Sequence, residues 1–589
     1  MNDPTTEPKR TAGRIGDALM SMTRIIPRRT GWIDLLVFGL LILLLYGLYT
    51  VETQWRAPTN SAFEIDLSIG ALPRYTFFSL CRGLAAFGLS FVFTLLYGYV
   101  AARVRGADRV MLPVLDILQS IPVLGFMPGV VLALAALFPN TNVGLELAAV
   151  LMIFTGQVWN MTFSFYHSLR AIPSDLMEAS AIYRFGWWRR FTRVELPYST
   201  VGLVWNGMMS MAGGWFFLTI NEAFRLGDKD FRLPGVGAYM SVAIDRDDYG
   251  AMFAAVTAMI VMIVVVDQLF WRPLVAWSNK FKFEDVAAST VTKSWVLELL
   301  RRTRFYAWLG ARRERTREAS REVAPAKLVV REPAPNRSPA ARRVFSTAAL
   351  VAFIALCAWG GWKLAHLLAV LNTGDWSSIG VASLYTLGRT TLAVALGSLW
   401  AIPAGIYIGT HPRASRLLQP IVQIAASFPA PMLFPIVLLL LARFDVSLSW
   451  GSIVLMMLGT QWYILFNVIA GAMSIPHELH EVATVYGFTR AQRWKRVLLP
   501  GVFPNLVTGW VTAAGGAWNA SIVSEYIHAG GSLQTTKGLG ALISTAAESG
   551  RFALLAAGVL AMAIVVVLIN RTFWKRLYDL AERKYALGR

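Results

Sequence analysis

One stretch of about two dozen residues occurs twice in this chain of 589 residues. The first copy covers residues 172–197 and the second covers residues 475–500, in one constant register. The same residue types recur at the same places: Pro173 and Pro476, Glu178 and Glu481, Tyr183 and Tyr486, Pro197 and Pro500. Each copy is a polar, basic interruption between long apolar runs. The chain is therefore expected to consist of two similar halves.

Composition indicates that these halves lie in a membrane. The chain is 56% hydrophobic and 15% charged, with a mean hydropathy of +0.51, whereas a soluble domain is roughly 25% charged. Crossing about 30 Å of hydrocarbon takes roughly 20 apolar residues, which must be helical because lipid offers the backbone no hydrogen-bond partner. We expect twelve such spans, near residues 32–50, 76–102, 111–137, 146–168, 198–224, 251–272, 345–370, 380–409, 417–441, 449–472, 502–525 and 552–571.

Charge and cysteine content narrow the class further. The net charge of +20 comes from Lys and Arg in loops between apolar runs, which indicates lipid headgroups and topology rather than nucleic acid. Cys81 and Cys357 both lie in apolar runs, and no spacing typical of a metal site is present, so we expect neither a disulfide nor a metal. The first apolar run has no cleavage site after it and is expected to be a retained helix.

The basic loops also give an orientation and a division into segments. They include both repeated stretches, so the positive-inside rule predicts that these stretches and both termini are cytoplasmic. We expect a cytoplasmic tail over 1–31, a first half over 32–278, a basic cytoplasmic linker over 279–343 and a second half over 344–589. The linker is expected to be a tether rather than a regulatory domain.

The repeat extends well beyond the opening stretch. Residues 113–128 match residues 420–435, and the residues that follow the basic stretches match as well. Both halves have six spans in one orientation. Such parallel repeats should be related by a pseudo-twofold axis along the membrane normal, with a solute path at their interface.

Several residues are candidates for that path. A Ser-x-Pro pattern interrupts one helix in each half, and non-helical backbone in a membrane is tolerated where it lines a cavity; a simple kink is the alternative. An acidic residue near a membrane helix either faces the path, contacts a solute-binding protein, or is a hydrated carboxylate at the interface that helps to shape the loop. Asn206, Asn221 and Asn519 are further polar candidates, for which the alternative is hydrogen bonding between helices. The path candidates are Ser120, Pro122, Ser427, Pro429, Trp215, Glu222, Trp518, Asn519 and Glu525.

The repeated stretch resembles the signature of membrane subunits of ABC importers, which is Glu-Ala-Ala, then a glycine six residues after the Glu, then Leu-Pro. The second copy fits with Glu481, Ala483, Gly487, Leu499 and Pro500. The first copy fits with Glu178, Ala179, Leu196 and Pro197, but Arg184 stands at the glycine position, and Gly186 is expected to provide the turn instead.

The resemblance implies an all-α integral membrane fold with about 12 transmembrane helices, arranged as two parallel six-helix repeats of the type I ABC importer permease kind. It implies a bacterial cytoplasmic (inner) membrane location and coupling helices that dock into two copies of an ATPase subunit. ATP and Mg would be bound there, leaving this chain without a cofactor, a metal or enzyme activity of its own. It also implies an extracytoplasmic solute-binding protein as partner.

A finer resemblance is to the nitrate/sulfonate/taurine branch of these permeases. It depends on Trp518 and Glu525, on Gly538-Leu-Gly540, on the Ser-x-Pro at 427–429 and on the residues that end the last span. The resemblance implies a small anion as solute. Fused permeases of the ferric-iron type leave a second substrate class open.

Two other classes of protein remain as alternatives. A proton- or ion-coupled secondary transporter can also have two six-span halves, but it does not need a long basic loop between the fourth and fifth spans of each half. A membrane enzyme would need a cluster of catalytic polar residues, whereas the six His residues are scattered. The sequence has no G-x-x-x-x-G-K-[ST] nucleotide site.

Overall fold

The computed structural model describes residues 32–57, 64–226, 229–281, 357–529 and 532–585, and the single positions 295, 296, 298, 351 and 355. It forms two compact units, a smaller one over Met1–Thr50 and Ser294–Glu332 and a larger one over Val51–Lys293 and Pro333–Arg589. Helix α2 (Trp32–Arg56) begins in the smaller unit, and its described apolar side chains between Ile42 and Tyr49 are mostly exposed. The tail 1–31 and nearly all of the linker lie outside the described residues.

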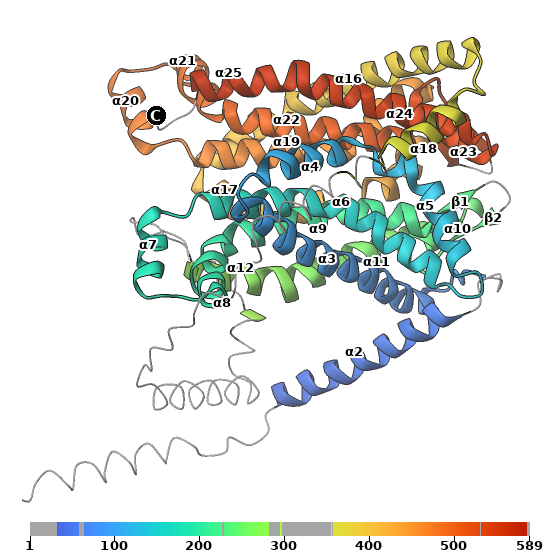
Figure 1. Ribbon diagram of the computed structural model, residues 1–589, viewed down its shortest axis with the longest axis horizontal. Helices are drawn as coiled ribbons and strands as arrows, with labels where there is room; N and C mark the ends of the chain where they lie inside the picture. Colours follow the sequence, from blue (N-terminus) through green and yellow to red (C-terminus); the bar gives the residue numbers. More distant parts are fainter. Residues whose placement is uncertain are drawn as a thin grey trace, which may run out of the picture. The chain divides into compact units, whose positions relative to one another are not determined.

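The first half of the larger unit is a series of helices with one short hairpin (Figure 1). In chain order its elements are η1 (Ile69–Ala71), α3 (Leu72–Arg103), α4 (Asp108–Ser120), α5 (Val123–Leu137), α6 (Val143–Arg170), α7 (Ser174–Ile182), α8 (Trp187–Arg190), the π-helical turn η2 (Phe191–Glu195), α9 (Leu196–Glu222), β1 (Arg225–Leu226), β2 (Lys229–Asp230), α10 (Val236–Asp245), α11 (Tyr249–Val266), the π-helical turn η3 (Asp267–Trp271), α12 (Arg272–Ser278) and η4 (Asn279–Phe281).

The second half repeats this order. Its elements are α16 (Thr373–Thr410), α17 (Pro412–Ser427), η5 (Ala430–Leu433), α18 (Phe434–Arg443), α19 (Leu448–Met473), α20 (His477–Val485), α21 (Arg490–Arg493), the π-helical turn η6 (Trp494–Leu498), α22 (Leu499–Ser524), β3 (Tyr526–Ala529), β4 (Ser532–Thr535), α23 (Leu539–Glu548), α24 (Phe552–Ile569), the π-helical turn η7 (Asn570–Trp574) and α25 (Lys575–Tyr585).

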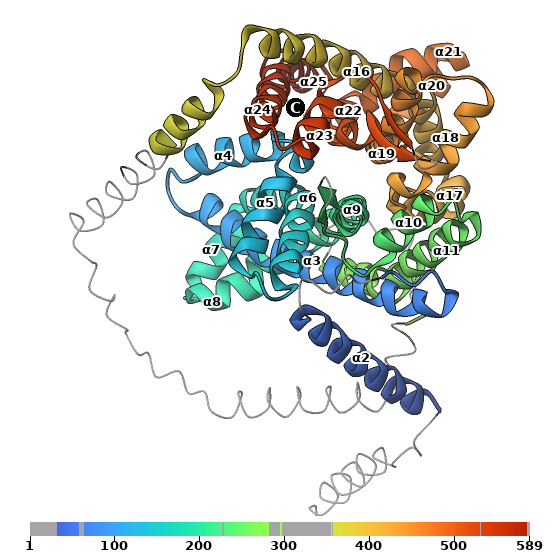
Figure 2. The ribbon, with the colours of Figure 1, turned by 90° about the vertical axis from the view of Figure 1, so that its right-hand side faces the viewer.

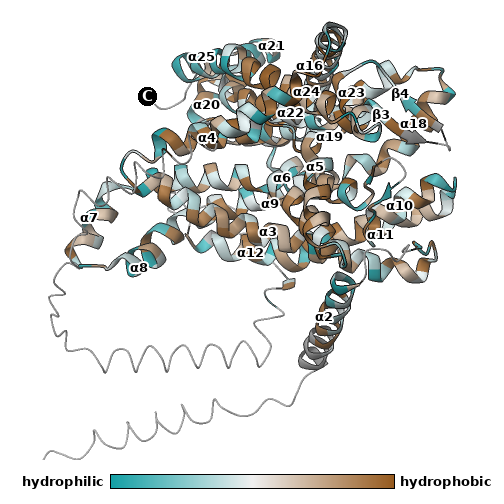
Figure 3. Ribbon diagram, turned by 45° about the vertical axis from the view of Figure 1, so that its right-hand side comes forward, coloured by the Kyte–Doolittle hydropathy of each residue, from teal (hydrophilic) through white to brown (hydrophobic). Residues whose placement is uncertain are grey.

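Within the described residues, seven helices are long and apolar enough to cross a membrane, or nine if each of two bent pairs counts as one span. The all-α membrane fold with two repeats is therefore confirmed, whereas the count of twelve is not. The predicted spans 32–50, 198–224 and 345–370 are not among the nine, and the last of these lies largely outside the described residues. Figure 3 shows hydrophilic residues on α8, α21 and α25, with hydrophobic residues along the long helices.

Two of the predicted spans are broken into two helices each, at the Ser-x-Pro patterns that were expected to interrupt them. Residues 111–137 form α4 and α5, which meet at 91°, and residues 417–441 form α17 and the helix that follows it, which meet at 83°. Both breaks precede a proline, which disfavours the helical conformation of the residue before it. Accordingly Ile121 has φ −79° and ψ 123°, and Phe428 has φ −72° and ψ 128°.

Each half also contains a short apolar helix that the sequence did not predict. Helices α10 and α23 are ten residues long, too short to cross a membrane, and each follows a small antiparallel hairpin. Both begin just after the first glycine of a Gly-x-Gly pattern, at Gly235 and Gly538.

The two halves pack through the bent pairs. Helices α4 and α5 contact α22, α23 and α24 of the second half, and α17 contacts α9 and α11 of the first (Figure 2). The largest group of buried apolar residues includes members from both halves, among them Val123, Met211, Met432 and Trp518. The breaks at 121–122 and 428–429 thus lie at the interface between the halves.

Candidate functional site

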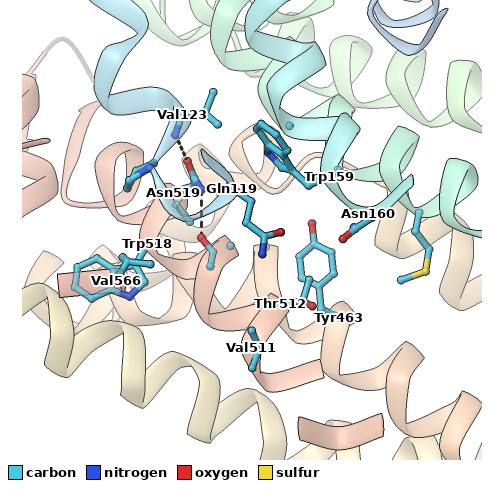
Figure 4. Close-up of a pocket in the computed structure, with 18 of the residues that line it drawn as sticks. Gln119, Val123, Trp159, Asn160, Tyr463, Val511, Thr512, Trp518, Asn519 and Val566 are labelled. Atoms are coloured by element: carbon cyan, nitrogen blue, oxygen red, sulfur yellow. Dashed lines mark hydrogen bonds between the residues drawn. The ribbon is translucent and has the colours of Figure 1, made fainter. Parts of the chain in front are cut away.

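A large cavity lies at this interface and is lined by both halves (Figure 4). Its volume is about 1050 Å³, just above the range of about 300–1000 Å³ that is usual for small-molecule sites. The lining comes from α4, α5, α6 and α9 and from α17, α19, α22, α24 and α25. The interface of parallel repeats is where a solute path is expected.

Four side chains at equivalent positions of the two halves line the cavity. Trp159 and Asn160 come from α6, and their counterparts Trp462 and Tyr463 come from α19. In the described part of the chain, the Asn160 amide and the Tyr463 hydroxyl make no hydrogen bond with another residue, and Figure 4 shows both beside the cavity. Their donors and acceptors are therefore available to a bound solute.

The cavity is open at one end and closed at the other. Its lining side chains are exposed at His167, Arg571 and Lys575, whereas Val123 and Trp518 at the opposite end are 5% and 3% exposed. Helix α22 lines the cavity from Thr508 to Ala520, which is about 18 Å at 1.5 Å per residue. The open end lies toward the start of α22, the end of the larger unit that carries α7 and α20 (Figure 1).

The structure separates the path candidates into two groups. Pro122, Pro429, Trp518 and Asn519 line the cavity. Ser427 instead borders a neighbouring void of about 10 Å³, and its hydroxyl donates to the Gln423 carbonyl. The side chain of Ser120 lies outside the description; its backbone ends α4 at the break.

The remaining Trp and Asn candidates make packing or hydrogen-bond contacts. Trp215 is 2% exposed and packs so close to Gly83 that an added Cβ there would lie 2.7 Å from its ring. Asn206 donates to Ser164 Oγ of α6 at 3.0 Å, which fits the alternative of hydrogen bonding between helices. Asn221 donates within its own helix to the Phe217 carbonyl. None of these three side chains lines the cavity.

Glu222 is not a path residue, a contact for another protein or a hydrated carboxylate, so these expectations are wrong. This carboxylate neither faces the cavity nor is hydrated, because it is fully buried. It accepts hydrogen bonds from Ser79 Oγ at 2.7 and 2.9 Å, from Arg82 Nη1 at 2.7 Å and from the Gly237 N–H at 2.8 Å. A buried charge is stable only when it is paired, so this carboxylate holds its partners in place. It thereby fixes the start of α10 against α3 and α9.

Glu525 is buried in the same way in the second half. It accepts from Thr386 Oγ1 at 2.9 Å, from Arg389 Nη1 at 3.0 Å and from the Gly540 N–H at 2.9 Å, and it too is fully buried. The two sites are equivalent in every element they use: the first long helix, the end of α9 or α22, and the start of α10 or α23. Both glutamates are therefore structural anchors of the short helices.

The arginines of these clusters were missed by the sequence interpretation. Arg82 and Arg389 are 2% and 6% exposed and lie inside the predicted spans 76–102 and 380–409. A cation inside a membrane span needs a partner, so the signal was present. Which residues pair with Arg82 could not be predicted, because its partners Glu146 and Glu222 lie 64 and 140 residues away along the chain.

The repeated stretches form short helices outside the long ones. Pro173 precedes α7 and Pro476 precedes α20, and the Leu-Pro pairs at 196–197 and 499–500 begin α9 and α22, as predicted. Glu178 and Glu481 are exposed. Ala483 is fully buried, and its counterpart in register in the first copy is Ser180, 5% exposed, rather than Ala179.

The expected role of Gly186 is wrong. Gly186 has φ −61° and ψ 161°, an ordinary extended conformation at the start of α8. Arg184 itself takes the left-handed conformation, with φ 50°, at the position where Gly487 has φ 63°. The two turns therefore have the same backbone geometry, and the first one achieves it with a side chain present.

Both short helices end in exposed apolar residues. Ile182 and Tyr183 are 79% and 75% exposed, and their counterparts Val485 and Tyr486 are 83% and 75% exposed. Exposed apolar residues that cluster on a soluble segment indicate a protein interaction site. Two such clusters, one from each half, lie at the end of the larger unit where the cavity opens (Figure 1).

A family model described as binding-protein-dependent transport system inner membrane component matches the chain twice, over residues 94–270 and 401–586. Together the two matches cover more than half of the chain. The chain belongs to this family. It is accordingly a multi-pass protein of the inner membrane, and each match contains one repeated stretch.

Curated permease proteins are similar to parts of this chain at low identity. A taurine transport system permease protein of Escherichia coli K12 is 28% identical over 185 residues, 31% of this chain and 64% of the relative. A nitrate import permease protein of Leptolyngbya laminosa is 28% identical over 185 residues, 31% of this chain and 63% of the relative. A trimethylamine N-oxide transport system permease protein of Pelagibacter ubique is 22% identical over 482 residues, 72% of this chain and 61% of the relative. The chain thus spans about three fifths of the length of each.

Metal binding has no structural support among the described residues. They contain no group of three or more His, Cys, Asp or Glu side chains arranged to hold an ion. The expectation that the chain carries no metal and no cofactor remains a prediction.

Proposed function

We propose that this chain is the transmembrane permease subunit of an ATP-driven ABC importer. Its two fused halves would form the solute path, and separate ATPase subunits would drive it. The observation that carries the proposal is the pair of exposed helices α7 and α20. They repeat one backbone geometry, down to the left-handed residues Arg184 and Gly487, and each presents an apolar tip.

The pairing of these tips supports a partner present in two copies. Ile182 with Tyr183, and Val485 with Tyr486, lie at equivalent positions and offer similar surfaces. Equivalent surfaces related by a pseudo-twofold axis fit two identical partners. We therefore propose two copies of an ATPase subunit, docked at residues 172–197 and 475–500, and no ATP site in this chain.

The cavity supports the transport part of the proposal. It is open toward the end that carries α7 and α20 and closed at the other end. This matches an inward-facing state of an alternating-access protein. The solute would be a small anion such as nitrate, sulfonate or taurine, delivered by an extracytoplasmic solute-binding protein. Arg571 and Lys575 at the opening, against the single acidic residue Asp116 in the described lining, favour an anion.

The test is purification of the tagged full-length chain, expressed with its neighbouring transport subunits, followed by mass analysis of the complex. We expect an ATPase subunit at two copies per chain. Replacing both tip tyrosines (Tyr183→Ala with Tyr486→Ala) should weaken docking by about 30-fold, as for a residue that contributes about 2 kcal/mol to an interface.

The control is Leu533→Ala, which removes an exposed apolar side chain from the hairpin β3–β4 and should leave the complex intact. A chain that purifies alone, and that transports in vesicles under an ion gradient without ATP, would contradict the proposal. The protein would then be a secondary transporter.

A further inference from the structure

A fully buried carboxylate connects the first repeated stretch to helix α3. Glu195 is the last residue of η2, directly before α9, and its side chain is 0% exposed. Its Oε1 lies 3.0 Å from Nε of Arg103, the last residue of α3, and 3.3 Å from Nε of Arg190, the last residue of α8. A buried charge is stable only when it is paired, so Glu195 holds the ends of α3 and α8 together.

Aromatic side chains strengthen this connection. Tyr99, one turn before the end of α3, packs edge to face on Trp187 and Phe191, with ring centroids 5.9 and 5.6 Å away. Trp187 Nε1 also donates to the Tyr99 hydroxyl at 2.6 Å. Edge-to-face pairs of rings add stability beyond the burial of their surface. The later part of the first repeated stretch, residues 184–195, is therefore attached to α3 by charge and by packing.

Helix α3 carries a second ion pair toward its other end. Arg82 binds Glu222 there, and Glu222 accepts from the Gly237 N–H at the start of α10. Arg82 and Arg103 are 21 residues apart (103 − 82), which is about 32 Å along a helix that rises 1.5 Å per residue. The helix is continuous between them and contains no proline there. Figure 1 shows α3 running from the end of the larger unit that carries α8 toward the end that carries α10.

The second half lacks the connection at the equivalent place. Thr410 and Leu498 stand at the positions of Arg103 and Glu195. Neither side chain can form an ion pair. The Thr410 hydroxyl instead donates at 2.7 Å to the Ile406 carbonyl of its own helix, α16. The second repeated stretch is thus held against α16 without a charged contact at this position.

Helix α16 also differs from α3 along its length. It contains Pro403 where α3 has Leu96, and a proline inside a helix removes one backbone hydrogen bond and kinks or weakens the helix. Arg493, the counterpart of Arg190, donates to Thr484 Oγ1 at 3.1 Å and so makes this contact within the second repeated stretch itself. The second stretch is therefore freer to move relative to its long helix than the first.

We propose that Glu195 is a positioning residue that makes the first repeated stretch and α3 move as one body, so that a displacement of α7 by a bound ATPase reaches α10 at the opposite end. The second repeated stretch has no equivalent connection to α23. Two identical ATPase copies then act on two halves that respond differently. The inference rests on the proposed importer function for the source of the displacement, whereas the contact between Arg103 and Glu195 needs no ATPase.

The first test measures the contact in the full-length chain in lipid nanodiscs, without an ATPase. Hydrogen–deuterium exchange of residues 184–195, which reports local opening, is compared for Arg103→Thr, Glu195→Leu and both together, each giving the first half the residue of the second. We expect each single change to raise the exchange rate about tenfold. The double change should raise it by less than the product of the two, because both remove the same ion pair.

Three comparisons control this test. Arg103→Lys keeps the positive charge and should retain most of the protection. Arg105→Thr removes an exposed arginine just beyond α3 and should change nothing. Exchange of residues 487–498 in the second half should be the same in all variants. Single effects that multiply in the double variant, or an equal rise at 487–498, would overturn the inference.

The second test uses the complex with the ATPase. Exchange is measured in α10 and in α23, with and without a non-hydrolysable ATP analogue. We expect Arg103→Thr to remove most of the change that the analogue causes in α10 and to leave the change in α23 as in the wild type. A role for Glu195 in stability alone would leave both responses in place. An unchanged response in α10, or equal losses in α10 and α23, would overturn the inference.

The two tests separate this inference from the importer itself. A chain that binds no ATPase, but whose variants Arg103→Thr and Glu195→Leu show the non-multiplicative effect, would refute the importer and leave the connection between the first repeated stretch and α3 standing. An ATPase that docks on a chain in which the two effects multiply would do the reverse.

Discussion

The two buried arginines, Arg82 and Arg389, lie at equivalent positions of the two halves but bind different partners. Arg82 binds Glu222 and also forms a two-point contact with Glu146, through Nε at 2.5 Å and Nη2 at 2.7 Å. Among the carboxylates that the structure describes, Arg389 binds Glu525 alone, and its other donors reach the Ser449 carbonyl at 3.2 Å and Thr536 Oγ1 at 2.9 Å. The first cluster therefore has one more carboxylate than the second.

Comparing the two clusters shows which groups are needed to position the short helices and which are not. Both clusters keep the arginine, the glutamate and a hydroxyl that accepts from the first N–H of the short helix, at Val236 or Leu539. These shared groups position α10 and α23. The second carboxylate is not needed for that geometry, since Ser449 and Thr536 satisfy the arginine in the other half.

The largest effect is expected from removing each arginine. Arg82→Met leaves two buried carboxylates without a cation, whereas Arg389→Met leaves one. Breaking a buried ion pair by removing one partner costs about 3–5 kcal/mol, so Arg82→Met should cost clearly more than Arg389→Met. The measurement is the midpoint of thermal unfolding of the purified chain, with the folded yield as a second readout.

Glu146→Gln is the matched control for this comparison, because it gives the first cluster the single carboxylate of the second. It should cost less than either arginine variant. Equal losses for Arg82→Met and Arg389→Met would contradict the idea that Glu146 adds a second carboxylate that depends on Arg82.

An intermediate effect, equal in the two halves, is expected at the glycines beside the glutamates. A Cβ at Gly235 would lie 2.3 Å from Glu222 Cδ, and one at Gly538 would lie 2.2 Å from Glu525 Oε2. Each Gly→Ala change overpacks a buried site and should cost about 1–3 kcal/mol in unfolding free energy. The measurement is the same thermal unfolding.

Gly129→Ala is the control, since a Cβ there meets no atom within 4 Å. It should be neutral or slightly stabilising in its helix. A large difference between Gly235→Ala and Gly538→Ala would show that the two anchors are not equivalent after all.

The smallest effect concerns the turns after α7 and α20. A left-handed residue other than glycine costs roughly 1–2 kcal/mol, so Arg184→Gly should stabilise the first turn by about 1 kcal/mol and Gly487→Ala should destabilise the second by a similar amount. Gly186→Ala, at φ −61° and in open space, should do neither. Proteolytic nicking of the two loops in the purified chain measures this local stability, and stabilisation by Gly186→Ala instead would contradict the assignment.

Much of the architecture could be predicted because it depends on local pattern. The register of the two copies from Pro173 and Pro476 onward predicted the parallel repeat, and apolar length predicted most of the long helices. The breaks before Pro122 and Pro429 followed from the effect of proline on the preceding residue. Such features need no knowledge of distant parts of the chain.

The candidate site was predicted less well, because its contacts join distant segments. Asn519 was a candidate on polarity alone; its bond to Val123 links residues 396 apart, which no local pattern reveals. Glu222 was expected to face the path or a wet interface, and its buried partner Arg82 could not be foreseen because it lies 140 residues earlier. The cavity between the halves could not be predicted from local pattern either, because its lining depends on how the two halves pack.

The spacing of the buried ion pairs along the chain has a consequence for biosynthesis. Arg82 is synthesised before both of its carboxylate partners, and the first of them, Glu146, follows 64 residues later. Arg389 is also synthesised first, but its partner Glu525 follows only after 136 residues. At roughly 5–20 residues per second, these intervals are about 3–13 s and about 7–27 s. During these intervals the inserted helix carries an arginine without its counter-ion. Inserting an unpaired charge costs about 2.5–3.5 kcal/mol when it lies at the centre of a membrane helix. Glu146 thus shortens, in the first half alone, the time for which a nascent span must wait for its counter-ion.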